Sequence, residues 1–173
     1  MHHTQPLHTL LRVSEVVKEA DKKFETIFGR SHGGVVETYL CDDAEYILIT
    51  LGSMTGLARN VADDLRKEGI KAGVLKIRFM RPFPHKEISD IVKNAKSIGV
   101  LEKDISFGYE GTVYTNVNAG LQRNGVSKVS HNFIAGLGGK DVSYEDVKNC
   151  FALLKADSDE KIHWIGLEVE IDV

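Results

Sequence analysis

The sequence predicts an α/β domain built as a three-layer sandwich, with helices on both faces of a mostly parallel sheet. Apolar stretches of strand length alternate with amphipathic stretches of helical length along most of the chain. The connecting segments are short and rich in Gly, which is typical of parallel strands joined by right-handed crossovers. The stretch Tyr46–Leu51 is nearly all apolar, as expected for a strand that is covered on both faces.

The first predicted element is an amphipathic helix from Leu10 to Phe28, which Gly29 ends. Its apolar residues recur at spacings of three and four, at Leu10, Val13, Val17, Ala20, Phe24 and Ile27. After a Gly-containing loop, Val35–Leu40 is predicted to be a short strand. Asp42 and Asp43 then turn the chain into the apolar strand.

The elements after this strand alternate in type. Strands are predicted over residues 73–79, 97–102 and 126–134, which makes five strands in total. Helices are predicted over residues 57–67, from Pro84 to about residue 95, over residues 111–124, and after Ser143. The stretch from Ser143 to Asp146 resembles a capping box, in which the serine hydroxyl accepts a hydrogen bond from the first turn of its helix.

The chain is predicted to have three parts: a linker helix over residues 1–30, the α/β domain over residues 31–156, and a C-terminal arm over residues 157–173. The arm places large apolar groups on an acidic segment, at Ile162, Trp164, Leu167, Val169 and Ile171. One interpretation is a terminal strand packed on the edge of this domain. The other is an arm whose apolar side contacts another domain or subunit.

Composition restricts the classes of function. The formal net charge is −3 and no polybasic run is present, so the sequence does not indicate a surface for nucleic acid or anionic membranes. No apolar stretch approaches the roughly 20 residues of a membrane span, and the N-terminus lacks a signal-peptide pattern. We therefore expect a cytoplasmic protein.

Metal-binding patterns are also missing from the sequence. The two cysteines, Cys41 and Cys150, are far apart and form no C-x-x-C pair, whereas iron–sulfur clusters and structural zinc typically need about four ligands at close spacing. The sequence therefore predicts two reduced, buried thiols. The histidines share no metal-ligand spacing either, so we expect no metal site.

Gly52–Gly56 is the first candidate binding loop, because it lies between a buried strand and a helix. Ser53 and Thr55 could there hold an anion with the free amides of the helix N-terminus. The spacing matches neither G-x-G-x-x-G nor a P-loop. A tight turn in which one of these residues caps the helix explains the loop as well.

Arg81 is a second candidate, since it follows a strand at the end where open α/β sheets bind ligands. Pro82 keeps Arg81 extended, and its guanidinium could meet a carboxylate or phosphate. An arginine paired within the domain or across an interface is the alternative.

Two more Gly-rich loops follow strands, at Ser106–Gly111 and Gly136–Gly139. The first contains the candidates Ser106 and Gly108. Such flexible loops on one edge suit a docking surface at least as well as a ligand pocket. No Ser, Cys or Lys stands in a recognisable catalytic triad, and we expect no catalytic residue in this chain.

Several stretches together resemble the second domain of pyruvate:ferredoxin oxidoreductase (pyruvate synthase) alpha subunits. They are Gly52–Gly56, Lys76–Pro84, Ile105–Gly108 and Asn132–Val142. Each motif alone is weak, but their order and spacing are specific. The resemblance implies a transketolase C-terminal-like domain with a five-stranded sheet, in which Val35–Leu40 runs antiparallel to the other strands.

The resemblance also implies a function. The family converts a 2-oxoacid, coenzyme A and oxidised ferredoxin into acyl-CoA, CO₂ and reduced ferredoxin, with thiamine diphosphate, Mg²⁺ and iron–sulfur clusters. These cofactors lie in other domains or subunits of the family, and pyruvate is the first substrate expected. We therefore expect a structural and subunit-assembly domain that is inactive alone. Its partners would be the preceding catalytic domain and the other subunits, with ferredoxin and CoA binding to the complete enzyme.

The residues leave two alternative functions open. One is a stand-alone flavodoxin-like module that binds a phosphate-bearing ligand, such as CoA or a nucleotide, at Gly52–Gly56 and Arg81. The other is a transketolase-like fragment that acts on sugar phosphates. The stretches Arg81–Pro84 and Gly136–Gly139 favour the ferredoxin-linked family over the latter.

Overall fold

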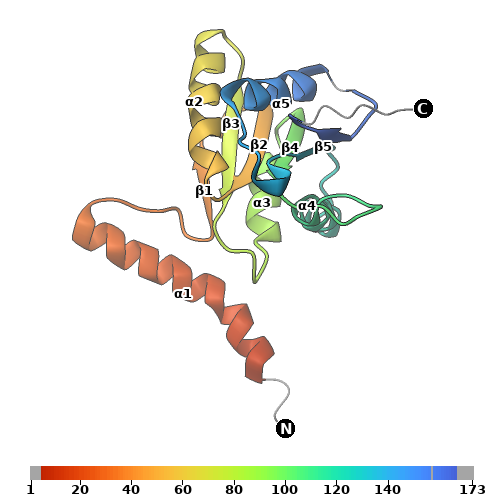
Figure 1. Cartoon of the computed structure of the whole chain (residues 1–173). Coiled ribbons are helices and arrows are strands. Elements are labelled where there is room, and N and C mark those ends of the chain that lie inside the picture. The colour runs from red at the N-terminus through yellow and green to blue at the C-terminus, as the bar shows by residue number, and fades with distance from the viewer. Residues whose placement is uncertain (1–4, 157, 167–173) are drawn as a thin grey trace.

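A six-stranded sheet forms the middle layer of the protein (Figure 1). The structure, a computed structural model, describes residues 5–156 and 158–166. The strands stand in the order β1-β3-β2-β4-β5-β6, with these bounds: β1 Val36–Tyr39, β2 Tyr46–Leu51, β3 Ala72–Ile77, β4 Ser97–Glu102, β5 Val129–Ile134 and β6 Ile162–Trp164. Among the strands that the structure describes, only β1 runs antiparallel to its neighbour, so the mixed sheet with one reversed strand is confirmed.

The sheet has six strands instead of the five expected, because β6 adds to its edge. Ile162–Trp164 pairs in parallel with β5, which agrees with the interpretation of the arm as a terminal strand. A strand of three residues is too short to show a period of two in the sequence. Leu167, Val169 and Ile171 lie outside the described residues.

Two pairs of helices cover the two faces of the sheet. One face carries α2 (Met54–Lys67) and α5 (Tyr144–Ala156), and the other carries α3 (His85–Val92) and α4 (Thr112–Arg123). Each pair closes its own apolar core, and all six residues of β4 are buried. The three-layer α/β/α architecture is therefore confirmed. It follows from strands that are apolar on both faces.

Local signals explain several helix ends. The hydroxyl of Ser143 accepts a hydrogen bond from the Asp146 amide at 3.1 Å, and the Asp146 carboxylate accepts from the Ser143 amide at 2.8 Å. These reciprocal bonds confirm the capping box at the start of α5. Helix α2 begins at Met54, three residues earlier than the apolar spacing predicts, because its first turn is part of the Gly-rich loop.

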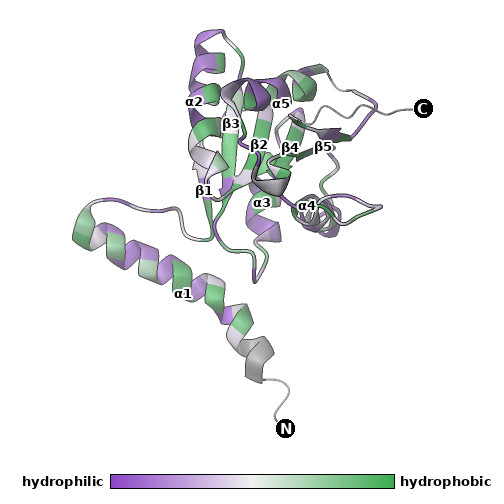
Figure 2. Cartoon of the chain, in the orientation of Figure 1, coloured by the Kyte–Doolittle hydropathy of each residue, from purple (hydrophilic) through white to green (hydrophobic). Residues whose placement is uncertain are grey.

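Helix α1 (Gln5–Phe28) lies outside the three layers (Figure 1). Figure 2 shows that hydrophobic residues fill the central strands, whereas on α1 they alternate with polar residues along a helix set apart from the sheet. In the part of the chain that the structure describes, no helix is long and apolar enough to span a membrane.

Candidate functional site

The strand order creates a crevice at the carboxyl ends of β2 and β4. The chain leaves β2 for β3 on one side and places β4 on the other, so the connections diverge between these two strands. Open α/β sheets bind ligands at such a switch point. A cleft of about 290 Å³ lies there, lined by Leu51, Gly52, Ser53, Met54, Glu102, Lys103, Asp104 and Val113.

The carboxylate of Glu102 lines this cleft and is held by hydrogen bonds within the domain. The backbone N–H groups of Val113 and Tyr114, at the start of α4, donate to it at 2.8 and 3.0 Å. The amide nitrogen of Asn132 donates at 2.8 Å. Burial raises the pKa of Glu102 above its ordinary value, although these donors partly oppose the rise.

Glu102 therefore fills the anion position at the N-terminus of α4. A phosphate placed there would be repelled by the negative charge of the Glu102 carboxylate. The amides of Val113 and Tyr114 already donate to that carboxylate and could not donate to the phosphate. The diphosphate of thiamine diphosphate does not fit at this helix end, and the other residues of the cleft place no cluster of metal ligands beside it.

Ser53 and Thr55 differ in what they can reach. Ser53 lines the cleft, is exposed, and makes no side-chain hydrogen bond to cap α2. Thr55 is buried, with its hydroxyl 3.0 Å from that of Thr50 on β2. Of these two candidates, only Ser53 can meet a ligand in the cleft.

Arg81 lies apart from the cleft. It is exposed in the segment between β3 and α3, and its guanidinium donates to the neighbouring Met80 carbonyl at 2.6 Å. It does not line the cleft with Ser53. The sequence suggested that a phosphate-bearing ligand could bind at both Gly52–Gly56 and Arg81. These two segments do not line one cleft.

Ser106 and Gly108 form a closed turn at the tip of the loop after β4. The Ser106 amide donates to the Glu110 carbonyl, and the Tyr109 amide donates to the Ser106 carbonyl. Gly108 has a φ of 79°, which the turn requires and L side chains rarely adopt. The turn presents the side chains of Phe107 and Tyr109 to solvent, with exposed fractions of 96% and 64%.

An iron–sulfur cluster does not fit the two cysteines. Cys41 belongs to the core beneath α3 and α4, whereas Cys150 belongs to the core beneath α2 and α5. The sheet therefore separates them, and burial raises the pKa of both thiols. Among the described residues, no three His, Cys, Asp or Glu side chains are grouped to hold a metal ion.

Sequence reasoning missed two buried polar arrangements. Glu102 was assigned only to a strand, although a carboxylate that ends an apolar strand signals a buried partner. His131 and His163 form the second arrangement: their ring nitrogens lie 2.9 Å apart between β5 and β6, and both rings stack near Phe133. No sequence signal could pair them without the position of β6.

Comparison with known proteins adds a decisive observation. A sequence model described as "Pyruvate:ferredoxin oxidoreductase core domain II" matches residues 44–147, which include the whole switch-point cleft. The chain belongs to this family. The resemblance recognised in the sequence is thereby confirmed. Helix α1 and the strands β1 and β6 lie outside the residues that match the family model.

Two relatives show how far the likeness extends. Pyruvate synthase subunit PorA of Pyrococcus horikoshii is 39% identical over 165 residues, which cover 92% of this chain and 42% of PorA. Ketoisovalerate oxidoreductase subunit VorA of the same organism is 36% identical over 159 residues, which cover 89% of this chain and 40% of VorA. The core domain II chain thus spans about two-fifths of the length of these curated relatives.

Solved structures support the fold. A 2-oxoglutarate:ferredoxin oxidoreductase from Magnetococcus marinus aligns with a TM-score of 0.52 at 17% identity, over 90% of this chain and 24% of its own. A split-gene transketolase aligns with a TM-score of 0.53 at 17% identity, over 69% of this chain and 41% of its own. The transketolase-like fold expected for core domain II is confirmed.

Proposed function

We propose that this chain is the core domain II of a 2-oxoacid:ferredoxin oxidoreductase and serves to assemble the enzyme. The complete enzyme would convert pyruvate, CoA and oxidised ferredoxin into acetyl-CoA, CO₂ and reduced ferredoxin in the cytoplasm. One observation carries the proposal: the match to PorA covers 92% of this chain and only 42% of that subunit. The chain therefore corresponds to one part of a larger subunit.

The geometry of the cleft supports an assembly role. Its buried carboxylate, Glu102, is committed to the amides of α4 and to Asn132. The exposed tip with Phe107 and Tyr109 suits contact with a protein, because aromatic side chains dominate binding at protein interfaces. In our proposal, residues 31–156 form the α/β domain, residues 1–30 a linker helix, and residues 157–173 an arm whose strand β6 joins the edge of the domain's sheet.

Cofactors and substrates would bind elsewhere in the complete enzyme. We assign thiamine diphosphate, Mg²⁺ and the iron–sulfur clusters to other domains or subunits. Support comes from Cys41 and Cys150, which lie on opposite sides of the sheet, and from Glu102, which fills the anion position of α4. Ferredoxin and CoA would likewise contact the complete enzyme. The PorA relatives favour pyruvate as substrate, and the VorA relatives make 2-oxoisovalerate the next choice.

Reconstitution tests the proposal. The chain alone should give no pyruvate-dependent reduction of a viologen dye. Dye reduction should appear when the chain is combined with the remainder of the alpha subunit and the other subunits. The control omits only this chain and should stay inactive. Partner subunits that are fully active without the chain, or that stay inactive with it although they are competent with their own core domain II, would contradict the proposal.

A further inference from the structure

Helix α1 exposes an apolar surface that nothing in the described part of the chain covers. It is 24 residues long, and none of its described side chains is buried. Leu10, Val16 and Ile27 have exposed fractions of 46%, 54% and 72%. Figure 2 shows hydrophobic residues along this helix, which lies outside the sandwich. Because helices in proteins gain most of their stability from packing an apolar face, this surface indicates a missing partner.

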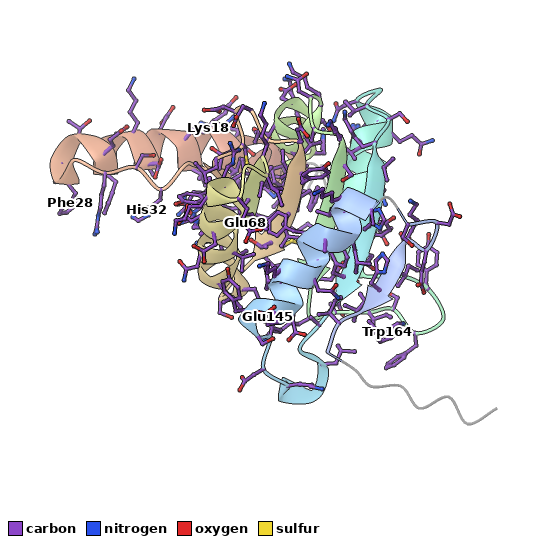
Figure 3. The ribbon with its side chains drawn as sticks, turned by 90° about the horizontal axis from the view of Figure 1, so that it is seen from above. Lys18, Phe28, His32, Glu68, Glu145 and Trp164 are labelled. Carbon is purple, nitrogen blue, oxygen red and sulfur yellow. The ribbon has the colours of Figure 1, made fainter. Side chains whose placement is uncertain are left out.

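The helix nevertheless makes polar contacts with the loop that follows it and with the domain. The carboxylate of Asp21 accepts hydrogen bonds from the Ser31 hydroxyl at 2.5 Å and from the His32 amide at 2.8 Å. Lys18 forms a salt bridge of 2.9 Å with Glu87 on α3. Figure 3 shows Lys18 near the domain, whereas Phe28 lies at the far end of the helix. The Asp21 bonds tie α1 to the loop that follows it and the salt bridge ties it to α3, but neither covers its apolar residues.

The apolar residues of α1 divide into two neighbouring stripes. Val17, Ala20 and Phe24 line a hollow that also contains residues of the domain. The free stripe consists of Val13, Val16 and Ile27, at helical spacings of three and eleven. A hollow of about 440 Å³ lies over the first half of the helix, lined by Thr9, Arg12, Val13, Val16 and Val17. The free stripe is therefore aliphatic, and its first two residues line a hollow.

Both signs of charge border the free stripe on the side away from the domain. By helical spacing, Arg12 and Lys23 lie there, and so does Glu19, three residues after Val16. All three are exposed, and none forms a salt bridge within residues 5–156 and 158–166. A complementary surface would have an aliphatic floor and a polar rim that carries both signs of charge.

The extent of the PorA match identifies the occupant. Because the match covers 92% of this chain, the unmatched remainder is shorter than α1, so part of α1 has a counterpart in PorA. PorA also contains a larger portion with no counterpart in this chain. We infer that the free stripe of α1 docks in an aliphatic groove on that remaining portion of the alpha subunit. This inference rests on the proposed function and deepens it.

Thiol labelling can test this inference. The native Cys41 and Cys150 are buried and their pKa values are raised, so a cysteine placed on α1 will react much faster than either. We would compare Val16→Cys on the free stripe with Glu15→Cys, an exposed position outside the stripe and about 100° around the helix from Val16. Each variant is made in the isolated chain and in a hybrid, in which this chain replaces the matched segment of Pyrococcus horikoshii PorA. Mass spectrometry of the α1 peptide reports the labelling rate.

The inference predicts that Val16→Cys reacts about tenfold or more slowly in the hybrid than in the isolated chain, while Glu15→Cys reacts equally in both. Equal rates for Val16→Cys would overturn it. Slow labelling of Val16→Cys in an isolated chain that sediments as a dimer would also overturn it, because a second copy would then be the occupant. Labelling requires no turnover, so a hybrid that protects position 16 but fails to reduce the dye would contradict only the proposed function.

Discussion

Gly111 lies directly against the carboxylate of Glu102, and a β-carbon at this position would collide with both carboxylate oxygens. The Gly111 amide donates to the Asn132 side-chain oxygen at 2.7 Å, and the Asn132 nitrogen donates to Glu102 at 2.8 Å. The three residues thus hold one another at the start of α4. Only a residue without a side chain allows the carboxylate to reach the first amides of this helix.

Substitution of Gly111 should therefore destabilise the domain. The methyl group of Gly111→Ala would push the Glu102 carboxylate away and leave buried donors without an acceptor. We expect the free energy of unfolding to fall by about 2–4 kcal/mol, measured by urea denaturation. The matched control is Gly56→Ala on α2, where a β-carbon meets no atom within 4 Å. This control should leave stability unchanged or raise it by about 0.5–1 kcal/mol. Equal effects of the two substitutions would contradict the role of Gly111.

Glu102 should also make stability depend on pH. Burial raises its pKa in the folded state, so the folded protein binds the proton more readily than the unfolded chain. The stability that the protonated Glu102 side chain contributes is fully present below the unfolded pKa of about 4.3. It is lost as pH rises through the folded pKa. The free energy of unfolding of Glu102→Gln, which does not titrate, should therefore fall less between pH 5 and pH 7 than that of the unsubstituted protein. A parallel pH dependence in the two proteins would contradict this assignment.

The sandwich could be predicted because its signals are local and repeated. Apolar runs at β2 and β4, Gly-terminated helices and the Ser143 capping box each follow from a few adjacent residues. The antiparallel direction of β1 could not be predicted in this way, and its prediction rests on the resemblance to a family. No property of Val36–Tyr39 alone distinguishes a parallel from an antiparallel neighbour.

The candidate site was harder to predict because its contacts join distant segments. The loops with Ser53, Arg81 and Ser106 were recognised, but composition could not show that Arg81 stays outside the cleft. The partners of Glu102 come from α4 and β5, and they meet only after the strands are ordered. The edge strand β6, which brings His163 to His131, was too short for periodicity to reveal.

The histidine pair should make the β6 edge sensitive to acid. Burial lowers the pKa of His163, so the folded state favours the neutral ring that shares a hydrogen bond with His131 at 2.9 Å. This stability is present above the unfolded pKa of about 6.5 and is lost as pH falls toward the folded pKa. Hydrogen exchange of the β6 amides should accelerate more than that of the β2 amides between pH 7.5 and pH 5.5, after correction for intrinsic rates.

The variant His163→Gln removes this titration and provides the comparison. Its β6 amides should exchange faster than those of the unsubstituted protein at pH 7.5, with a smaller further change on acidification. The exposed His32, substituted by Gln, should leave the behaviour of β6 unaltered. If His163→Gln kept the full acid response, another group would have to loosen this edge.

Phe107 should matter for assembly and not for folding. Its side chain is 96% exposed at the tip of a turn that backbone hydrogen bonds already close. Phe107→Ala should therefore change the free energy of unfolding by less than about 0.5 kcal/mol, whereas Phe133→Ala in the core should cost about 3–5 kcal/mol.

In the reconstituted oxidoreductase, Phe107→Ala should weaken association about tenfold, because exposed aromatic anchors concentrate binding energy. The association is measured by titrating the chain into the remaining subunits and following dye reduction. Unchanged association would remove this turn from the assembly surface, and strong destabilisation would mean that Phe107 packs within the domain.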